Sequence, residues 1–224
     1  PVLEFCSNDL SALYFDIRKD SLYCDRPDAI RRRAARTVMH EVFLRLTAWL
    51  APLTPFTMEE AWGTRYPDGG SNCARVIPET PGAWQDKNEA DRWKHVQRTL
   101  NVVNAALEEA RRRKGLGNSL DAAVSIHVAN SVIRGYLESL LDLSDVMRTS
   151  VASVHSAGQL TVMDTEGGFW LPEEPEISVV VTILTTPKCA RSWRRVPDVG
   201  SDPAYPELSA RDADAVRWWD ARRG

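Results

Sequence analysis

Arginine is the residue type with the clearest capacity for binding chemistry in this 224-residue sequence, because its side chains gather at two places. Five arginines fall within the eleven residues 26–36, and a run of four basic residues ends at Lys114. A guanidinium group binds phosphate through two parallel hydrogen bonds, so a row of arginines at helical spacing can follow a nucleic-acid backbone. The same arginines would also suit solvated helix faces with ion pairs to Asp25, Asp28 and Glu108, and composition alone leaves both interpretations open.

Catalytic and nucleotide-binding motifs are missing from the sequence. It contains no glycine-rich phosphate loop, no G-x-S-x-G and no H-E-x-x-H. The lone G-x-G at residues 115–117 follows a helical pattern and is explained as a helix cap. The four histidines lie far apart without metal-ligand spacing, so each is expected at the surface or at the edge of the core.

Cysteine usage and net charge narrow the class of protein. None of the four cysteines pairs with another in a C-x-x-C motif, which favours a reducing compartment, with the cytoplasm as the default. The net charge of −3 excludes a simple polycation that coats nucleic acid. The longest apolar run, residues 177–184, falls short of the roughly 20 residues that a membrane-spanning helix needs. We therefore expect no membrane association.

Charge is distributed unevenly along the chain. Residues 1–115 and 187–224 each carry a net charge of +2, whereas residues 116–186 carry −7. This pattern indicates regions with different partners, and an anionic ligand should avoid much of the acidic middle. The sequence begins with Pro1 rather than Met and no signal segment follows, so we expect it to be a piece of a longer protein.

Apolar periodicity predicts the helices that must position the basic residues. The first long helix starts near Pro27, stops near Pro52, and is expected to pack inward the face formed by residues 30, 34, 38, 42 and 46. A capping-box pattern at 57–60 predicts a short helix through Trp62, and residues 66–81 predict a loop. A second long helix is predicted from residue 86 to Lys114. Its apolar row is Trp93, Val96, Leu100, Val103, Leu107 and Ala110.

Beyond residue 117 the apolar period changes from helical to alternating. Strands are predicted over residues 123–128, 151–155, 159–163 and 177–184, with a short helix over 132–141. The predicted fold is therefore mainly α. It consists of a helical bundle over residues 1–117, a small α+β domain over residues 118–186 and a loop-rich, ribbon-like tail over residues 187–224.

Several strings in the first half resemble a known family. NDLSALYFDIRKDSLY at residues 8–23 resembles the opening of the anticodon-binding helical domain of class I aminoacyl-tRNA synthetases of the isoleucine, valine and leucine group. LAPLTPFTMEEAW at residues 50–62 is similar to the L-A-P-x-x-P-F-x-x-E-E-x-W pattern of that domain. VVNAALEEAR at 102–111 and GNSLDA at 117–122 resemble its last long helix and the crossing to the next unit. The resemblance covers residues 1–122.

The tail resembles the C-terminal zinc knuckle of bacterial isoleucyl-tRNA synthetases, a family pattern of K-C-x-R-C-W, D-V-G and L-C-x-R-C. The framework remains in residues 188–212, but most metal ligands do not. Cys189 is kept, whereas Ser192, Ser209 and Asp212 stand where the family has cysteines. Structural zinc needs four ligands, usually thiolate or imidazole, so we predict no zinc. The knuckle is then expected to be held by packing of aromatic residues. These are Trp193, Tyr205, Trp218 and Trp219.

The resemblance implies a role in tRNA binding rather than catalysis. By family, the parent joins isoleucine to its tRNA with ATP and Mg²⁺, in catalytic and editing domains that precede Pro1. The H-I-G-H and K-M-S-K-S signatures that bind ATP are absent here, so the chain alone is expected to be inactive, to hold no cofactor and to be a monomer. The bundle should face the anticodon stem, and the α+β domain and tail should reach the loop.

Two kinds of contact are expected with the isoleucine tRNA. Phosphates should meet basic side chains of the helical region, and unpaired bases should stack on aromatic side chains of the tail. The predicted phosphate contacts are Lys19, Arg32, Arg36, Arg98, Arg111, Arg112 and Arg113, and the predicted stacking residue is Trp193 or Trp218. A helical-bundle interaction module without RNA is the main alternative, supported by the negative net charge. The equivalent region of a valyl or leucyl enzyme is a second, which the tail argues against.

Overall fold

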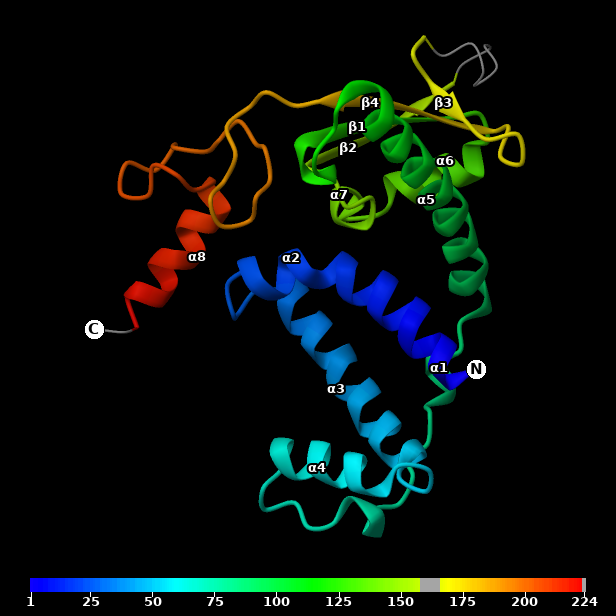
Figure 1. Ribbon diagram of the computed structural model, residues 1–224, viewed down its shortest axis with the longest axis vertical. Coiled ribbons are helices and arrows are strands. Elements are labelled where there is room, and N and C mark those ends of the chain that lie inside the picture. The colour runs from blue at the N-terminus through cyan, green and yellow to red at the C-terminus, as the bar shows by residue number, and fades with distance from the viewer. Residues whose placement is uncertain (158–165, 223–224) are drawn as a thin grey trace. The chain divides into compact units, whose positions relative to one another are not determined.

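The computed structural model describes residues 1–157 and 166–222, which fold as two compact units. One unit joins Pro1–Arg26 to Lys87–Gly224, and Pro27–Asp86 forms the other. Figure 1 shows the helices and strands of both units along the chain. The domain boundaries predicted at residues 117 and 186 stay a prediction.

The unit Pro27–Asp86 is built from two helices and a long loop. Helix α3 (Ile30–Leu50) ends close to the predicted stop near Pro52 but begins three residues after the predicted start at Pro27. Helix α4 (Pro55–Arg65) begins two residues before the predicted capping box at 57–60, so that start was wrong. Thr54 is the N-cap and Pro55 opens the first turn, a position where its fixed φ suits a helix and its missing N–H costs nothing. The loop contains the short 3₁₀ turns Asn72–Ala74 and Gly82–Trp84.

Arginine side chains stacked on tryptophan rings fasten this loop to the helices. The guanidinium of Arg75 lies 3.7 Å from the ring centroid of Trp62, and it donates hydrogen bonds to the side chains of Asn72 and Thr47 at 2.7 and 3.0 Å. Arg45 lies 4.6 Å from the ring centroid of Trp84 and donates to the carbonyl of Glu79 at 2.8 Å. Cation–π contacts and satisfied hydrogen bonds thus replace part of an aliphatic core.

The predicted inward face of α3 was wrong over its first half. Ile30 is 84% exposed and Val38 is also exposed, whereas the buried positions are Ala35, Arg45, Thr47 and Ala48. Helix α4 and the loop pack against the second half of α3, where small side chains allow a close approach. An apolar row on a helix is a core face only where another element covers it.

The other unit has a helical part whose longest element is α5 (Lys87–Lys114), within one residue of the predicted bounds. Most of its predicted apolar row is buried, including Val96, Leu100 and Leu107. The helix ends before Gly115, whose φ of +69° is the left-handed conformation that glycine adopts without cost. A second run of helix combines α1 (Val2–Glu4), a π-helical segment Phe5–Phe15 and α2 (Asp16–Cys24).

A four-stranded mixed sheet packs against α5 (Figure 1). Its order is β2–β1–β4–β3, with β1 parallel to β2 and antiparallel to β4. The strands are β1 (Ala122–Val128), β2 (Val151–Ser156), β3 (Phe169–Trp170) and β4 (Ile177–Ile183). Helices α6 (Ser131–Glu138) and α7 (Leu143–Val146) join β1 to β2. The α+β prediction is confirmed for three strands and α6; β3 and α7 were not predicted, and the strand predicted at 159–163 lies outside the described residues.

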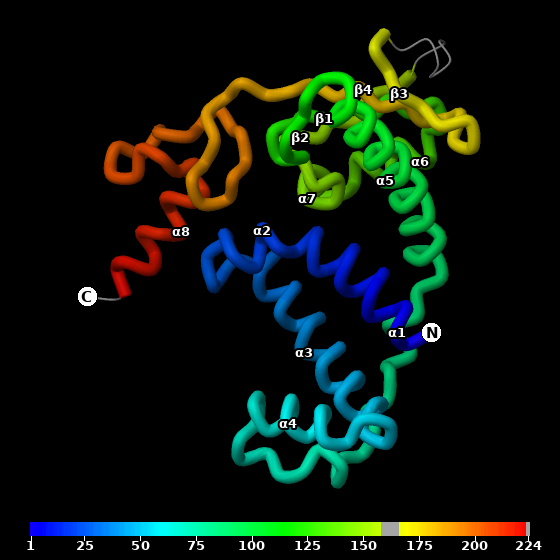
Figure 2. The backbone as a smooth tube through the Cα atoms, viewed as in Figure 1, coloured from blue at the N-terminus to red at the C-terminus, as the bar shows by residue number. Residues whose placement is uncertain are grey.

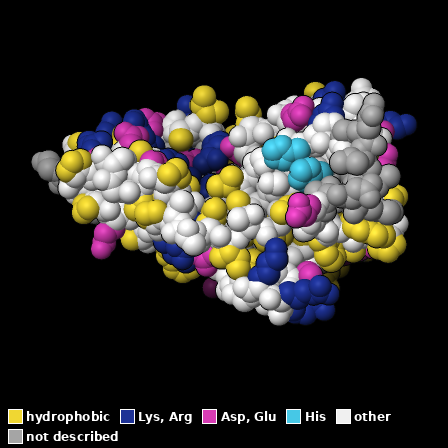
Figure 3. Space-filling view, turned by 90° about the horizontal axis from the view of Figure 1, so that it is seen from above, with side chains coloured by type: hydrophobic (Ala, Val, Ile, Leu, Met, Phe, Trp, Pro, Cys, Tyr) yellow, Lys and Arg dark blue, Asp and Glu magenta, His cyan; other side chains and the backbone are white. Residues whose placement is uncertain are grey.

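The parallel register of β1 and β2 places two histidines side by side. His127 is the register partner of His155, and their ring centroids are 5.2 Å apart with an interplanar angle of 27°. Figure 3 shows histidine side chains gathered at one place on the surface. Burial and the neighbouring His155 both lower the pKa of His127, because each disfavours the imidazolium form.

This pair predicts that acidification destabilises the sheet. A histidine whose folded-state pKa is lowered binds fewer protons when folded, so its favourable contribution is present above the unfolded-state pKa and is lost as the pH falls through it. The melting temperature of the chain should therefore drop between pH 7.5 and pH 5, and His127→Gln should reduce that drop. The melting temperatures are measured by circular dichroism, with His95→Gln as the control. If His127→Gln leaves the dependence of the melting temperature on pH unchanged, His127 is not the group responsible.

The tail from Pro187 is an irregular segment followed by helix α8 (Ala210–Asp220), which the loop-dominated prediction missed (Figure 2). The side chain of Ser209 caps this helix by accepting a hydrogen bond from the N–H of Asp212. The predicted aromatic packing was wrong for Trp193 and Trp219, which are both exposed. Within residues 1–157 and 166–222, no helix is both long and apolar enough to cross a membrane.

Candidate nucleic-acid interface

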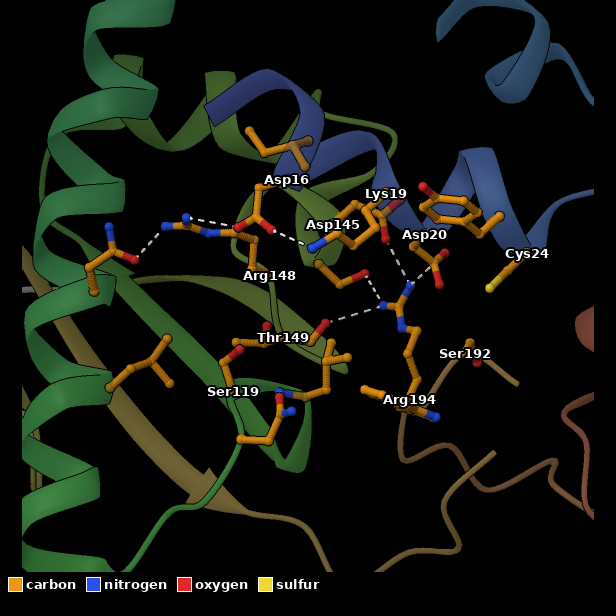
Figure 4. Close-up of a pocket in the computed structure, with 18 of the residues that line it drawn as sticks. Asp16, Lys19, Asp20, Cys24, Ser119, Asp145, Arg148, Thr149, Ser192 and Arg194 are labelled. Carbon is orange, nitrogen blue, oxygen red and sulfur yellow. Dashed lines mark hydrogen bonds and ion pairs between the residues drawn. The ribbon is translucent and has the colours of Figure 1, made fainter. Parts of the chain in front are cut away.

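A pocket of about 830 Å³ opens where α2, the C-terminal half of α5, α7 and the tail meet (Figure 4). Asp16, Lys19 and Asp20 face it from α2, Arg148 follows α7, and Arg194 enters from the tail. Most of its lining residues have polar side chains, and their charges are nearly balanced. An anionic ligand must therefore compete with carboxylates that already hold guanidinium groups.

Three of the nine predicted contact residues line this one pocket. Lys19 and Arg111 lie on its helical walls, and Trp193 lies on the tail wall. Lys19 pairs with Asp16 at 3.4 Å, and Arg111 pairs with Glu108. Each is an exposed ion pair between residues of the same helix, the first in α2 and the second in α5. Such pairs contribute little to stability, so the basic side chain can exchange its carboxylate partner for a phosphate oxygen.

Sequence reasoning did not predict three arginines of the pocket as contacts: Arg148, Arg191 and Arg194. Arg148 donates to the side chains of Asn104 and Asp16 at 2.7 and 3.2 Å, and its φ of +56° is unusual for a residue with a side chain. Arg194 donates to Asp145 at 2.8 Å and to the carbonyl of Ser150 at 2.8 Å. Arg148 has no basic neighbour in sequence, and Arg194 adjoins Arg195 but lies outside the predicted helices, so no helical row of basic residues marks either of them.

The remaining predicted phosphate contacts are not among the residues that line the pocket. Arg98 forms a bidentate pair with Glu174, at 2.8 and 2.9 Å from its Nε. Arg112 and Arg113 both pair with Glu109, yet the Arg112 side chain stays 74% exposed and open to a ligand. Arg32 and Arg36 belong to α3 in the other unit. The pairs of Arg112 and Arg113 are local ion pairs of the kind that the alternative interpretation expects, whereas the pair of Arg98 and Glu174 spans 76 residues of sequence. Whether these arginines also bind phosphate stays a prediction.

The two candidate stacking residues differ in their surroundings. Trp193 is 58% exposed and has a φ of +63°, an outlier for a bulky residue. Such strain persists only where surrounding contacts impose it, and it is typical of functional positions. Trp218 is partly buried; the guanidinium of Arg222 lies 3.9 Å from its ring centroid, and the Trp219 ring packs edge-on against it. Trp193 is thus the better placed of the two for stacking on a base.

Burial of Cys24 excludes one other chemistry at the pocket. The pKa of its thiol is raised to about 11, first by burial and then by the carboxylates of Asp20 and Asp212. The sulfur is therefore protonated near neutral pH and unsuited to nucleophilic attack. Among the described residues, the structure brings together no catalytic constellation of the kinds sought in the sequence.

The four positions of the degenerate zinc knuckle converge on one carboxylate. The Asp212 side chain is fully buried, and its Oδ2 lies 3.1 Å from the sulfur of Cys189 and 2.8 Å from the hydroxyl of Ser209. The buried hydroxyl of Ser192 faces the same group without a well-formed hydrogen bond. Burial opposes ionisation of Asp212, but Arg211 and the surrounding hydroxyl and thiol groups hold its pKa below the ordinary value.

These residues do not fit zinc. The metal requires deprotonated donors, whereas Ser192 and Ser209 offer neutral hydroxyls and Asp212 is engaged by two guanidinium groups. Arg191 donates to its Oδ1 at 2.8 Å, and Arg211 lies 3.3 Å from its Oδ2. A second cation at this place would be repelled. No cluster of three or more histidine, cysteine or acidic side chains suited to a metal occurs in the part of the chain that the structure describes.

Comparison with known proteins decides the family. Residues 1–126 match the model of the anticodon-binding domain of tRNA ligase. This chain belongs to the anticodon-binding domain family of tRNA ligases. The matched residues include α2, α3, α4, α5 and most of the first strand. They therefore also include all seven predicted phosphate contacts of this anticodon-binding chain.

Curated relatives extend the match to the whole anticodon-binding chain. The isoleucine--tRNA ligase of Caulobacter vibrioides is 52% identical over 224 residues, which is all of this chain and 22% of the relative. The enzymes of the same name from Brucella abortus and Agrobacterium fabrum are 46% and 43% identical over 96% of this chain, again 22% of each relative. The chain therefore spans about a fifth of the length of the relatives it matches.

Proposed function

We propose that this chain is the tRNA-binding part of an isoleucine--tRNA ligase, and that it grips the anticodon stem-loop of the isoleucine tRNA. The single observation that carries the proposal is the 52% identity to a ligase of that name across every part of the chain, tail included. The chemistry belongs to the parent, which uses ATP and Mg²⁺ in domains outside this chain. The chain alone holds no cofactor, acts as a monomer in the cytoplasm and does not catalyse aminoacylation.

The surface chemistry of the chain supports this role. Exposed arginines on α5 offer phosphate contacts, and the pocket places Lys19, Arg111 and Trp193 around one opening. A polar pocket with an exposed tryptophan at its edge suits an unpaired base more than an aliphatic ligand. The acidic sheet region has a different character and is proposed to stay off the RNA.

Titration of the chain with cognate and non-cognate tRNA tests the proposal. Isoleucine tRNA should bind more tightly than valine tRNA, and the logarithm of the association constant should fall linearly with the logarithm of salt concentration. Weak binding that is equal for both tRNAs and insensitive to salt would favour the interaction module without RNA. Tighter binding of valine tRNA would instead indicate that the chain is the equivalent part of a valine enzyme.

Two variants separate phosphate contacts from stacking. Arg112→Ala should lower the slope of log affinity against log salt by about one and weaken all tRNAs alike, because it removes one released counterion. Trp193→Ala should cost roughly 1–3 kcal/mol at an unchanged slope and narrow the gap between cognate and non-cognate tRNA, while Trp193→Phe retains most of the affinity. Arg134→Ala, in the acidic region, is the control for charge. Unchanged affinities of both alanine variants would remove these two residues from the interface.

A further inference from the structure

The buried centre of the tail has the opposite polarity to a metal knuckle. In a zinc knuckle a cation is surrounded by anionic ligands. Here the carboxylate of Asp212 takes the central place, and the groups around it are donors or cations. We call this cluster the Asp212 hub. It consists of Cys189, Arg191, Ser209, Arg211 and Asp212.

We propose that the Asp212 hub fixes the conformation of the tail without a metal, in the place that zinc takes in a cysteine-bearing tail. Arg191 and Arg211 also fasten the tail to the C-terminal end of α2. The proposal concerns how the tail is positioned, and it stands whichever tRNA the chain binds.

Contacts inside the tail show how the hub fixes it. Residues 189 and 209 come from separate segments, and the N–H of Ser209 lies 3.4 Å from the sulfur of Cys189. The N–H of Ala190 donates to the carbonyl of Glu207 at 3.0 Å, which closes the same two segments. Because Asp212 lies in the first turn of α8, its carboxylate joins both segments to the start of that helix.

Arg191 carries the order outward to α2. Its guanidinium donates to the Oδ1 of Asp212 and to the backbone carbonyl of Tyr23, at 2.8 and 2.7 Å, and it also donates to the carbonyl of Cys24. The last carbonyls of a helix lack intrahelical partners and carry partial negative charge, so a cation there satisfies and stabilises them. Only the planar fork of arginine reaches two carbonyls and a carboxylate at once.

Arg211 makes a second connection to the same helix. It forms a bidentate pair with Asp20 and lies 3.6 Å from a carboxylate oxygen of Asp25, just beyond the end of α2. It also lies 3.3 Å from Asp212. The two arginines therefore both join the end of α2 to Asp212. In this partly buried cluster two guanidinium groups face the carboxylates of Asp20, Asp25 and Asp212.

Hydrogen exchange on the full chain tests the hub directly. Asp212→Asn should speed exchange of the amides of Ala190 and Ser209 at least tenfold, and Arg191→Lys should do so as well, because a single ammonium cannot reach all three acceptors. Asp214 lies on α8, as Asp212 does, and forms an exposed ion pair with Arg26. Asp214→Asn should therefore leave these amides protected. EDTA should change nothing in the unsubstituted chain. Equal protection in Asp212→Asn, or loosening of the tail by EDTA, would overturn the proposal.

A gain of metal binding provides the complementary test. The combined substitutions Ser192→Cys, Ser209→Cys and Asp212→Cys complete two C-x-x-C pairs with Cys189 and remove the central carboxylate. This variant should bind one zinc per chain by elemental analysis, and its tail amides should be protected with zinc and exchange at least tenfold faster after EDTA. If it binds no zinc, or if its tail is as protected after EDTA as before, the hub does not occupy the place of a metal and the proposal fails.

Discussion

Replacing Arg194 by alanine should lower the free energy of unfolding by about 3–5 kcal/mol, the range for breaking a buried ion pair by removing one partner. The side chain of Arg194 is 13% exposed, and it donates hydrogen bonds of 2.6–2.8 Å to Asp145, Ser144 and the carbonyl of Ser150. Its loss would leave the buried carboxylate of Asp145 without this guanidinium. Urea denaturation followed by circular dichroism measures the change.

A double-mutant cycle assigns the effect to the pair. Arg194→Ala combined with Asp145→Ala should be less destabilised than the sum of the single variants, because the second substitution removes the charge that the first leaves behind. Arg134→Ala breaks a partly exposed pair with Glu138 and should cost less than about 1 kcal/mol. Additive single effects would show that Arg194 acts through packing of its stem rather than through its charge.

Leu100→Ala should destabilise the chain by about 2–5 kcal/mol, because it removes a side chain that is only 3% exposed and leaves a cavity. Leu100 lies in the buried row of α5, in the core cluster that α5 shares with the sheet. The matched control is Leu141→Ala, since Leu141 is fully exposed and its truncation should stay within about 0.5 kcal/mol. Similar melting curves for the two variants would contradict the packing of α5 on the sheet.

Structure that depends on neighbouring residues was predicted accurately from the sequence, whereas structure that depends on contacts between distant residues was not. Helix α5 was predicted to within one residue because its apolar row and its glycine stop are local signals that tertiary packing reinforces. The same kind of row on α3 predicted the helix but not its buried face, because the burial of Ile30 or Val38 depends on what covers them. Periodicity gives the direction of a face and does not supply its partner.

The tail shows how one interpretation can hide another. Ser209 and Asp212 are spaced as a capping box, which predicts the start of α8. Their interpretation as replaced metal ligands led to a loop prediction instead. In the structure the Ser209 hydroxyl caps the helix by accepting a hydrogen bond from the N–H of Asp212, and it also donates to the Asp212 carboxylate. The pocket was beyond prediction for a different reason: Asp16 and Arg148 meet across 132 residues of sequence, and no short pattern encodes such a contact.

The clamp on α2 has a consequence for how the chain is made. The end of α2 meets Arg191 and Arg211, which follow in sequence by 167 and 191 residues. At ribosomal rates of roughly 5–20 residues per second, those arginines emerge about 10–40 s after the helix they hold. Until then the carbonyl of Cys24 lacks its contact with Arg191, and the carboxylate of Asp20 lacks its pair with Arg211. A chain that is cut short before Arg191 lacks both arginines, so the end of α2 is fastened only after the tail has been synthesised.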